Sequence, residues 1–249
     1  MDIEVLSTII LAVSAIILYY DIVKFFRKSK FPYFIGRPKK ALMLFLALEM
    51  IAAIAIIVVE LIPFILNLDG RIFGIVAGMA EEPGKILPVI YLARKNKFFK
   101  EYLKEGGWFY VGLLAGLGFG IFEGVLYSIG IIATATSIED ALASILLGRL
   151  TVIGLHVTFT VIATWGYSRL LNGSRLGLVL GLGGATIMHS TYDFLVYSSY
   201  ITGLTLHVLL ASLIYPIALT FYFILKRGVA NFYTGGNLSW LFRVFIINS

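Results

Sequence analysis

The sequence predicts an all-α membrane protein, a polytopic bundle of transmembrane helices. The 249 residues are 59% hydrophobic and only 14% charged, and their mean hydropathy is +0.94, which is far too apolar for a soluble domain of this length. The apolar residues run in stretches of about 20, the length that a helix needs to cross a bilayer. The charged residues gather in the short segments between these stretches. Together these observations leave no room for a sizeable soluble domain.

Seven apolar stretches are present, and we expect residues 1–249 to form a single membrane-embedded domain around them. The last residues contain Trp240, Phe242 and Arg243, a mixture typical of a segment that lies in the membrane interface. The predicted spans cover residues of about 5–26, 41–66, 71–93, 108–133, 144–168, 176–198 and 203–225, followed by an interfacial tail over 229–247.

The charges of the connecting segments predict the topology. Segments 24–40, 94–104, 169–175 and 226–227 are basic, whereas 67–71, 133–143 and 198–203 are neutral or acidic. The positive-inside rule then places the N-terminus outside and the C-terminus in the cytoplasm of a multi-pass cell-membrane protein. The net charge of +6 therefore reflects topology and does not indicate nucleic-acid binding, and the absence of cysteine excludes disulfides and thiolate sites.

Three charged residues lie inside the third predicted span, namely Glu81, Glu82 and Lys85. Each lone charge at the bilayer centre costs about 2.5–3.5 kcal/mol, so this group needs partners or a function. Glu81 and Lys85 are four residues apart and can form an ion pair along the helix, whereas Glu82 points about 100° away and is left over. A purely structural ion pair with a spare acid is the alternative to a functional site.

The second span carries Glu49 and Glu60, which are eleven residues apart and share a helix face. Glu60 is close to the predicted outer end and is expected to be solvated. Glu49 lies deeper, where either a structural partner such as Arg149 or a functional role would explain it. His207 near the start of the last span is expected at the membrane interface.

Small residues recur at every fourth position in the fourth and sixth spans. Such rows let membrane helices approach closely, so we expect these two spans to form the tight core of the bundle. The rows consist of Gly112, Gly116, Gly120 and Gly124, and of Gly177, Gly181 and Ala185.

Polar residues in four predicted spans lie at a similar depth. At a rise of about 1.5 Å per residue, Glu81, Glu123 and His189 lie about 15 Å below the outer ends of their spans, and His156 about 18 Å. Asp193 follows His189 by four residues and shares its helix face. Imidazoles and carboxylates at one level can hold Zn²⁺ and activate a water for hydrolysis. Each residue alone also has a structural explanation, such as an interhelical hydrogen bond.

The motifs Glu81-Glu82-x-x-Lys85, Phe119-x-x-x-Glu123, His156 and His189-x-x-x-Asp193 resemble, in this order, those of the PrsW family. These are intramembrane metalloproteases within the wider group of type II CAAX-prenyl proteases. The resemblance extends from the third to the sixth span. In the prenyl-protein branch the second motif ends in histidine and the fourth usually in asparagine. This chain has Glu123 and Asp193 at those positions, so it resembles the PrsW branch more closely. No His-Glu-x-x-His or Gly-x-Ser-x-Gly motif is present.

The resemblance implies an endopeptidase that hydrolyses membrane-anchored proteins, for instance a regulator of the anti-sigma-factor type. The estimated depth of the polar residues places the expected cleavage near the outer half of the bilayer. The resemblance also implies that Glu81 activates water, Glu82 assists, and Lys85 holds both acids in place. It assigns a divalent metal, zinc by ligand preference, to a set consisting of Glu123, His156, His189 and Asp193. A metal-free mechanism, in which Glu81 activates water and histidine stabilises the oxyanion, uses the same residues and stays open.

Two other classes of function compete with this interpretation. A proton- or ion-coupled transporter would use the acids and histidines as a relay, and it predicts proton flux without any protein substrate. A non-catalytic scaffold would use the histidines to bridge helices, and it predicts neither metal nor hydrolysis. The presence of Glu81 and Glu82 together argues against the scaffold.

Overall fold

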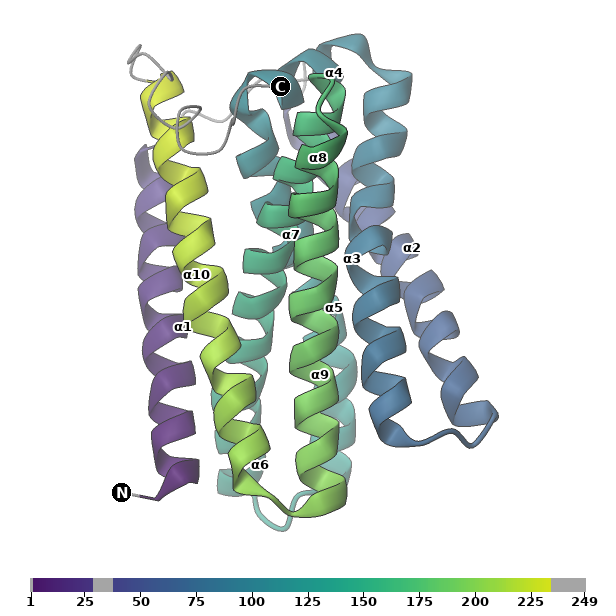
Figure 1. Cartoon of the computed structure of the whole chain (residues 1–249), viewed down its shortest axis with the longest axis vertical. Helices are drawn as coiled ribbons and strands as arrows, with labels where there is room; N and C mark the ends of the chain where they lie inside the picture. Colours follow the sequence, from purple (N-terminus) through teal and green to yellow (C-terminus); the bar gives the residue numbers. More distant parts are fainter. Residues whose placement is uncertain (1, 29–37, 234–249) are drawn as a thin grey trace.

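The computed structural model describes residues 2–28 and 38–233, which form a bundle of helices running up and down along one axis (Figure 1). No strand occurs in these two stretches, which confirms the all-α prediction. The long helices are α1 (Ile3–Lys28), α2 (Pro38–Ile65), α3 (Gly70–Lys95), α5 (Trp108–Thr134), α7 (Leu150–Leu171), α9 (Gly184–Thr202) and α10 (Thr205–Tyr233). The short helices are α4 (Lys97–Tyr102), α6 (Ile138–Ala143) and α8 (Arg175–Leu178), and single π-helical turns are η1 (Leu103–Gly107), η2 (Ser144–Arg149) and η3 (Val179–Gly183).

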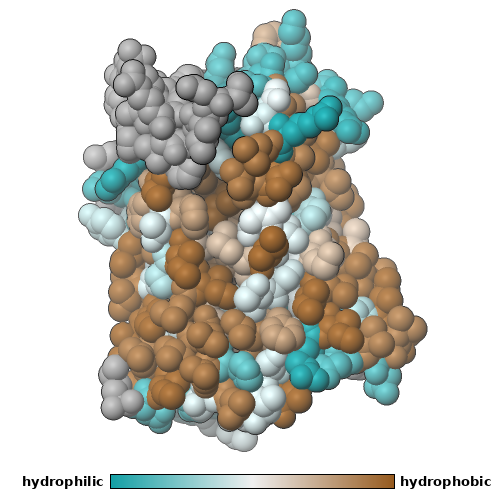
Figure 2. Space-filling view, viewed as in Figure 1, coloured by the Kyte–Doolittle hydropathy of each residue, from teal (hydrophilic) through white to brown (hydrophobic). Residues whose placement is uncertain are grey.

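Within the described residues, five helical stretches are long and apolar enough to cross a membrane. Figure 2 shows hydrophobic residues over the middle of the visible face and hydrophilic residues gathered toward its ends, as expected for a membrane protein. α3 and the run α8–η3–α9 lie alongside the five in the same bundle (Figure 1). The five stretches are Ile3–Lys24, Leu46–Pro63, Lys97–Thr134, Ile138–Leu171 and Thr205–Val229.

Helix α7 is the axis of the bundle, because every residue from 154 to 164 is buried. The two rows of small residues both pack on it and not on each other, which corrects the predicted pairing of the fourth and sixth spans. A Cβ added at Gly112 would lie 2.8 Å from Val161 Cα, and one at Gly116 would lie 2.5 Å from Val157 Cα. A Cβ at Gly181 would overlap Gly166, so glycine meets glycine where η3 crosses α7.

Helices α3 and α9 also approach closely, through glycines of α3 that were not among the predicted rows of small residues. A Cβ at Gly74 would lie 2.8 Å from the Asp193 carbonyl carbon, and one at Gly78 would overlap the Ser190 backbone. α3 is capped at its start by the Asp69 side chain, which accepts from Arg71 N at 2.8 Å. The close contact holds the charged turn of α3 next to the polar face of α9.

Helices α1 and α10 pair at the edge of the bundle (Figure 1). Asp21 on α1 accepts a hydrogen bond from the Tyr222 hydroxyl of α10 at 3.0 Å and forms an ion pair with Lys226. Residues 229–233 of the predicted interfacial tail form the last turn of α10. The rest of that predicted segment, 234–247, lies outside the described residues.

Candidate functional site

The ammonium group of Lys85 is the centre of a polar cluster inside the bundle. It lies 2.7 Å from Glu81 Oε2 and 2.8 Å from Glu82 Oε1, and the Lys85 side chain is fully buried. The predicted pair of Glu81 and Lys85 is therefore present. Glu82 is not left over, because the long lysine side chain reaches carboxylates both three and four residues earlier.

His156 on α7 connects Lys85 to α5. Lys85 Nζ lies 2.7 Å from His156 Nδ1, and His156 Nε2 lies 2.5 Å from Glu123 Oε2. Since an ammonium group can only donate, His156 accepts at Nδ1 and donates from Nε2 to Glu123. Three helices thus meet in one chain of hydrogen bonds.

His189 on α9 reaches the same acids, and its ring packs edge-on against that of His156 with centroids 5.3 Å apart. Its Nδ1 lies 2.8 Å from Glu82 Oε1, whereas its Nε2 is 3.4 Å from Asp193 Oδ2 and 3.7 Å from Glu81 Oε2. The latter two distances are longer than a hydrogen bond, so His189 Nε2 faces two carboxylates without being tightly held by either.

Aromatic rings close the cluster on its inner side. The Phe119 ring lies beneath Lys85, with 4.3 Å between Nζ and the ring centroid, and it packs edge-on against His156. Phe159 packs against His189 with ring centroids 5.2 Å apart. The side chains of Asp193 and Glu123 are 19% and 11% exposed, against 4% for Glu81, so the cluster opens on their side.

Four residues of the cluster could hold a metal ion, because one ligand atom from each lies within 4.8 Å of the others. Carboxylate oxygens and imidazole nitrogens suit a divalent metal such as zinc. Glu82 Oε2 is buried without a hydrogen-bond partner and has lone pairs to offer. Lys85 contacts three of the four residues, so a metal held by all of them requires its ammonium group to move aside. The four are Glu81, Glu82, His156 and His189.

This group differs from the ligand set implied by the family resemblance. His156 and His189 occur in both, while Glu123 and Asp193 lie beside the imidazoles and contact them. Carboxylates in that position commonly orient metal-binding histidines from the second layer. Direct ligation by Glu123 and Asp193 stays a prediction.

Glu60 on α2 belongs to the same region, although we expected it to be solvated. The residue is only 7% exposed, its Oε1 has no hydrogen-bond partner, and its carboxyl group lies within hydrogen-bonding reach of Glu81. That expectation was wrong because Glu60 lies on the face of α2 that meets α3, whereas its neighbours Leu61 and Ile62 are 45% and 49% exposed. The face shared with Glu49 was the one sequence signal that could have indicated it.

Two other polar residues lie apart from the cluster's hydrogen bonds. Glu49 is fully buried with both carboxylate oxygens unpartnered, and it forms no ion pair with the suggested partner Arg149. The Arg149 guanidinium lies instead over the Tyr127 ring at 4.9 Å. His207 contacts the Thr202 hydroxyl at 3.1 Å and does not line the site.

The cluster holds more acids than cations. Five carboxyl groups face one lysine and two imidazoles, so the acids outnumber the cations even if both imidazoles are charged. Unmatched charge is costly in an apolar interior, so protons or a bound cation must balance it. The acids are Glu60, Glu81, Glu82, Glu123 and Asp193.

Comparison with known families agrees with this geometry. Neither the curated proteins nor the solved structures give a match to the chain. The model of the family described as PrsW family intramembrane metalloprotease matches residues 37–224, which include every residue of the cluster and most of the chain. The chain therefore belongs to the PrsW family of intramembrane metalloproteases.

Proposed function

We propose that the protein is an intramembrane endopeptidase that hydrolyses peptide bonds of membrane-anchored proteins. The observation that carries this proposal is the convergence of α3, α5, α7 and α9 on one buried group of carboxylates and imidazoles. A relay or a packing element needs polar residues, but it does not need two acids, two histidines and a lysine within direct contact. These are the groups that general acid–base hydrolysis uses.

Glu81 is the proposed general base. Its Oε2 lies 3.4 Å from His156 Nδ1 and 3.7 Å from His189 Nε2, so a water between the imidazoles would be within its reach. Glu81 would take a proton from the attacking water and return it to the leaving nitrogen. Glu82 orients His189 through Nδ1, and Lys85 holds both acids. In a metal-dependent form of the mechanism the Lys85 ammonium group would move aside, and His156 and His189 would hold a divalent metal together with Glu82, or with Glu123 and Asp193, while Glu81 stays free to act as the base. The metal would polarise the water and the scissile carbonyl.

Purified protein in liposomes with a single-span reporter substrate tests the proposal. Glu81→Ala and His189→Ala should each lower the cleavage rate by at least about 100-fold, because general-base catalysis contributes that much or more. Glu139→Ala and His207→Ala, which alter an exposed acid and a histidine outside the cluster, should cleave normally. Normal cleavage by both site variants would refute the assignment, and proton flux without substrate that depends on Glu81 would favour a transporter.

The metal is tested separately, with zinc as the proposed ion. We expect 1,10-phenanthroline to abolish cleavage and added Zn²⁺ to restore it, and purified protein to contain about one zinc per chain. Glu82→Gln and His189→Ala should both lower that zinc content. If the protein contains no metal and keeps full activity in chelator, the metal-free mechanism with Glu81 as the base is correct.

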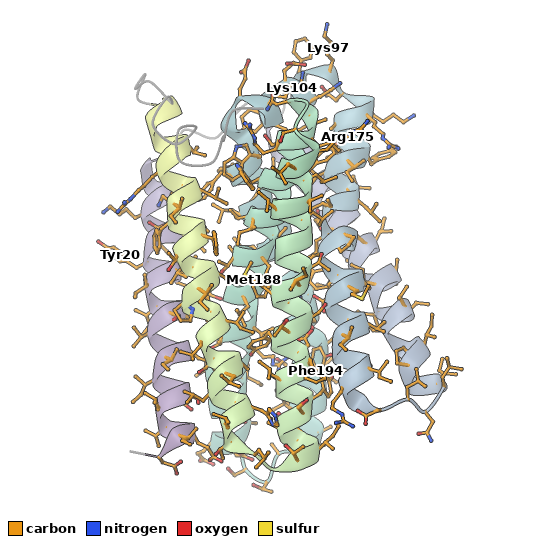
Figure 3. All side chains as sticks on the ribbon, in the orientation of Figure 1. Tyr20, Lys97, Lys104, Arg175, Met188 and Phe194 are labelled. Atoms are coloured by element: carbon orange, nitrogen blue, oxygen red, sulfur yellow. The ribbon has the colours of Figure 1, made fainter. Side chains whose placement is uncertain are left out.

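We further propose seven membrane crossings, with the N-terminus outside and the C-terminus in the cytoplasm. Figure 3 shows Lys97, Lys104 and Arg175 at one end of the bundle, opposite the start of α1. Because the chain has no cysteine, single replacements report topology cleanly. In intact cells, Glu139→Cys should react with an impermeant maleimide and Lys95→Cys should not. The reverse pattern would invert the topology.

The substrate class follows from the family resemblance rather than from the geometry. We propose a membrane-anchored regulatory protein of the anti-sigma-factor type, cut in the outer half of the bilayer of the cell membrane. The same resemblance supports placing the chain within the wider group of type II CAAX-prenyl proteases. Appearance of a shortened form of a single-span protein only in cells with active Glu81 would identify the substrate.

A further inference from the structure

A groove with a cavity volume of about 860 Å³ opens at the basic end of the bundle, between α3, α4, α7 and the run α8–η3. Its walls are apolar and its rim is basic. The walls include Ile86, Ile90, Leu170, Leu171, Leu178 and Leu182. The rim carries Arg94, Lys95, Lys97 and Lys100, with Glu101 as its one acid.

The change in residue size along α3 explains why the groove opens there. At Gly74 and Gly78 the backbones of α3 and α9 touch, whereas about two and three turns beyond Gly78 α3 presents Ile86 and Ile90 to the space beside Leu182. Large side chains keep helices apart. The two helices therefore hold tightly at the polar cluster and leave a gap toward the basic end.

Helix α4 places two lysines over this gap. Asn96 caps α4 by accepting from Phe99 N at 3.1 Å, and the Phe99 side chain is buried. Lys97 and Lys100 are three residues apart, so they lie on one face of α4, and both line the groove.

The rim cations have no acidic partner among the described residues. Glu101 lies 3.1 Å from Lys104, so its charge is already matched. Arg94 and Lys95 end α3, where cations interact favourably with the helix dipole. Lys97 is the first residue of α4, where the helix dipole disfavours a cation, so the dipole does not account for a lysine at this position.

We propose that this groove binds one anionic phospholipid from the leaflet that faces the basic loops. The phosphate would lie at Lys97, Lys100 and Arg94, and an acyl chain would lie along the leucines of α7, α8 and η3. The volume falls in the range of small-molecule sites, which is about 300–1,000 Å³. A free anion would use the rim without the apolar wall, and an apolar ligand would use the wall without the cations.

Lipid retention by the full-length protein tests this proposal without reference to cleavage. Protein in nanodiscs of phosphatidylcholine and phosphatidylglycerol is released into detergent, and the bound lipids are counted by native mass spectrometry. Lys97→Gln/Lys100→Gln should retain phosphatidylglycerol on the order of tenfold less than wild type, since two surface cations are removed. The matched control is Lys24→Gln/Arg227→Gln, which removes two exposed cations from α1 and α10 and should retain the wild-type amount.

A wall variant separates lipid from other anions. Leu178→Trp keeps every rim charge and fills part of the groove, so it should also lose phosphatidylglycerol. Equal loss in the rim variant and its control would show diffuse attraction and overturn the proposal, as would no retention by wild type. Displacement by millimolar inorganic phosphate would mark a general anion site and overturn it. Slower reporter cleavage by the rim variant with unchanged lipid retention would assign the groove to substrate and overturn it too.

Discussion

Two interhelical polar clusters differ in how their charges are matched. At the edge, Asp21 of α1 meets Lys226 and the Tyr222 hydroxyl of α10, so one acid faces one cation and one donor. In the centre, Lys85 is shared between Glu81 and Glu82, with further acids behind them. The side chains of Asp21 and Lys226 are 15% and 21% exposed, whereas Lys85 is fully buried.

The difference is the one expected between a structural contact and a proposed functional site. A balanced pair near a helix end can extend its charged groups toward interfacial water, and it needs nothing else. A buried group with excess acid is stable only with a further proton or cation, which a balanced pair does not need. We therefore place the proposed chemistry at the centre, whereas the contact at the edge joins α1 to α10.

The largest expected effect is on stability, from removing the central cation. Lys85→Met leaves Glu81 and Glu82 buried without it and should lower the free energy of unfolding by about 3–5 kcal/mol. Thermal unfolding in detergent with chelator present measures this. Adding Glu82→Gln to the variant should restore part of the loss, because one of the two stranded charges is gone.

The control for that experiment is Lys104→Met, which breaks the half-exposed pair with Glu101. Surface pairs contribute about 0–1 kcal/mol, so this variant should unfold almost like wild type. If both lysine variants lost the same stability, excess acid in the centre would have no special energetic role.

A smaller effect is expected from the carboxylate that holds His156. Glu123→Gln removes the charged partner at 2.5 Å from His156 Nε2 and should lower kcat about 10- to 100-fold with little change in KM. Zinc affinity should fall over a similar range. Glu139→Gln, in a short exposed helix, is the matched acid and should change neither quantity. Unchanged kcat in Glu123→Gln would make that contact structural only.

The fold class could be predicted because long apolar stretches form membrane helices, and five described stretches are long and apolar enough to cross a membrane. The spacing of Gly112 and Gly116 also predicted close packing, but it did not identify α7 as the partner. A row of small residues predicts that another helix packs closely against it, but it does not predict which helix. That choice depends on the whole bundle, and here the buried α7 lies between the two rows.

The candidate site could be predicted where the signal is local to one helix. The spacing of four residues predicted the contacts of Glu81 with Lys85 and, more loosely, of His189 with Asp193. The spacing did not predict the contact of Glu60 with Glu81, because the two residues lie on different helices. It left Glu82 unpaired, because the partners of Glu82 are His189 on α9 and the flexible side chain of Lys85. Contacts between residues on different helices depend on how each helix is rotated about its own axis. The spacing of residues along one helix does not determine that rotation.

The smallest predicted effect is at the edge of the bundle. Asp21→Asn removes the charge that Lys226 faces but leaves an amide that can still accept from Tyr222, so the free energy of unfolding should fall by only about 1 kcal/mol. Reporter cleavage should remain at the wild-type rate, because the ion pairs of the Lys85 cluster join α3, α5, α7 and α9 and none involves a residue of α1. Thermal unfolding and cleavage are measured on the same preparation as Lys85→Met. A loss at Asp21 as large as that at Lys85 would mean that any interhelical charge in this bundle is equally costly to disturb, and charge imbalance would no longer distinguish the site from a fastening contact.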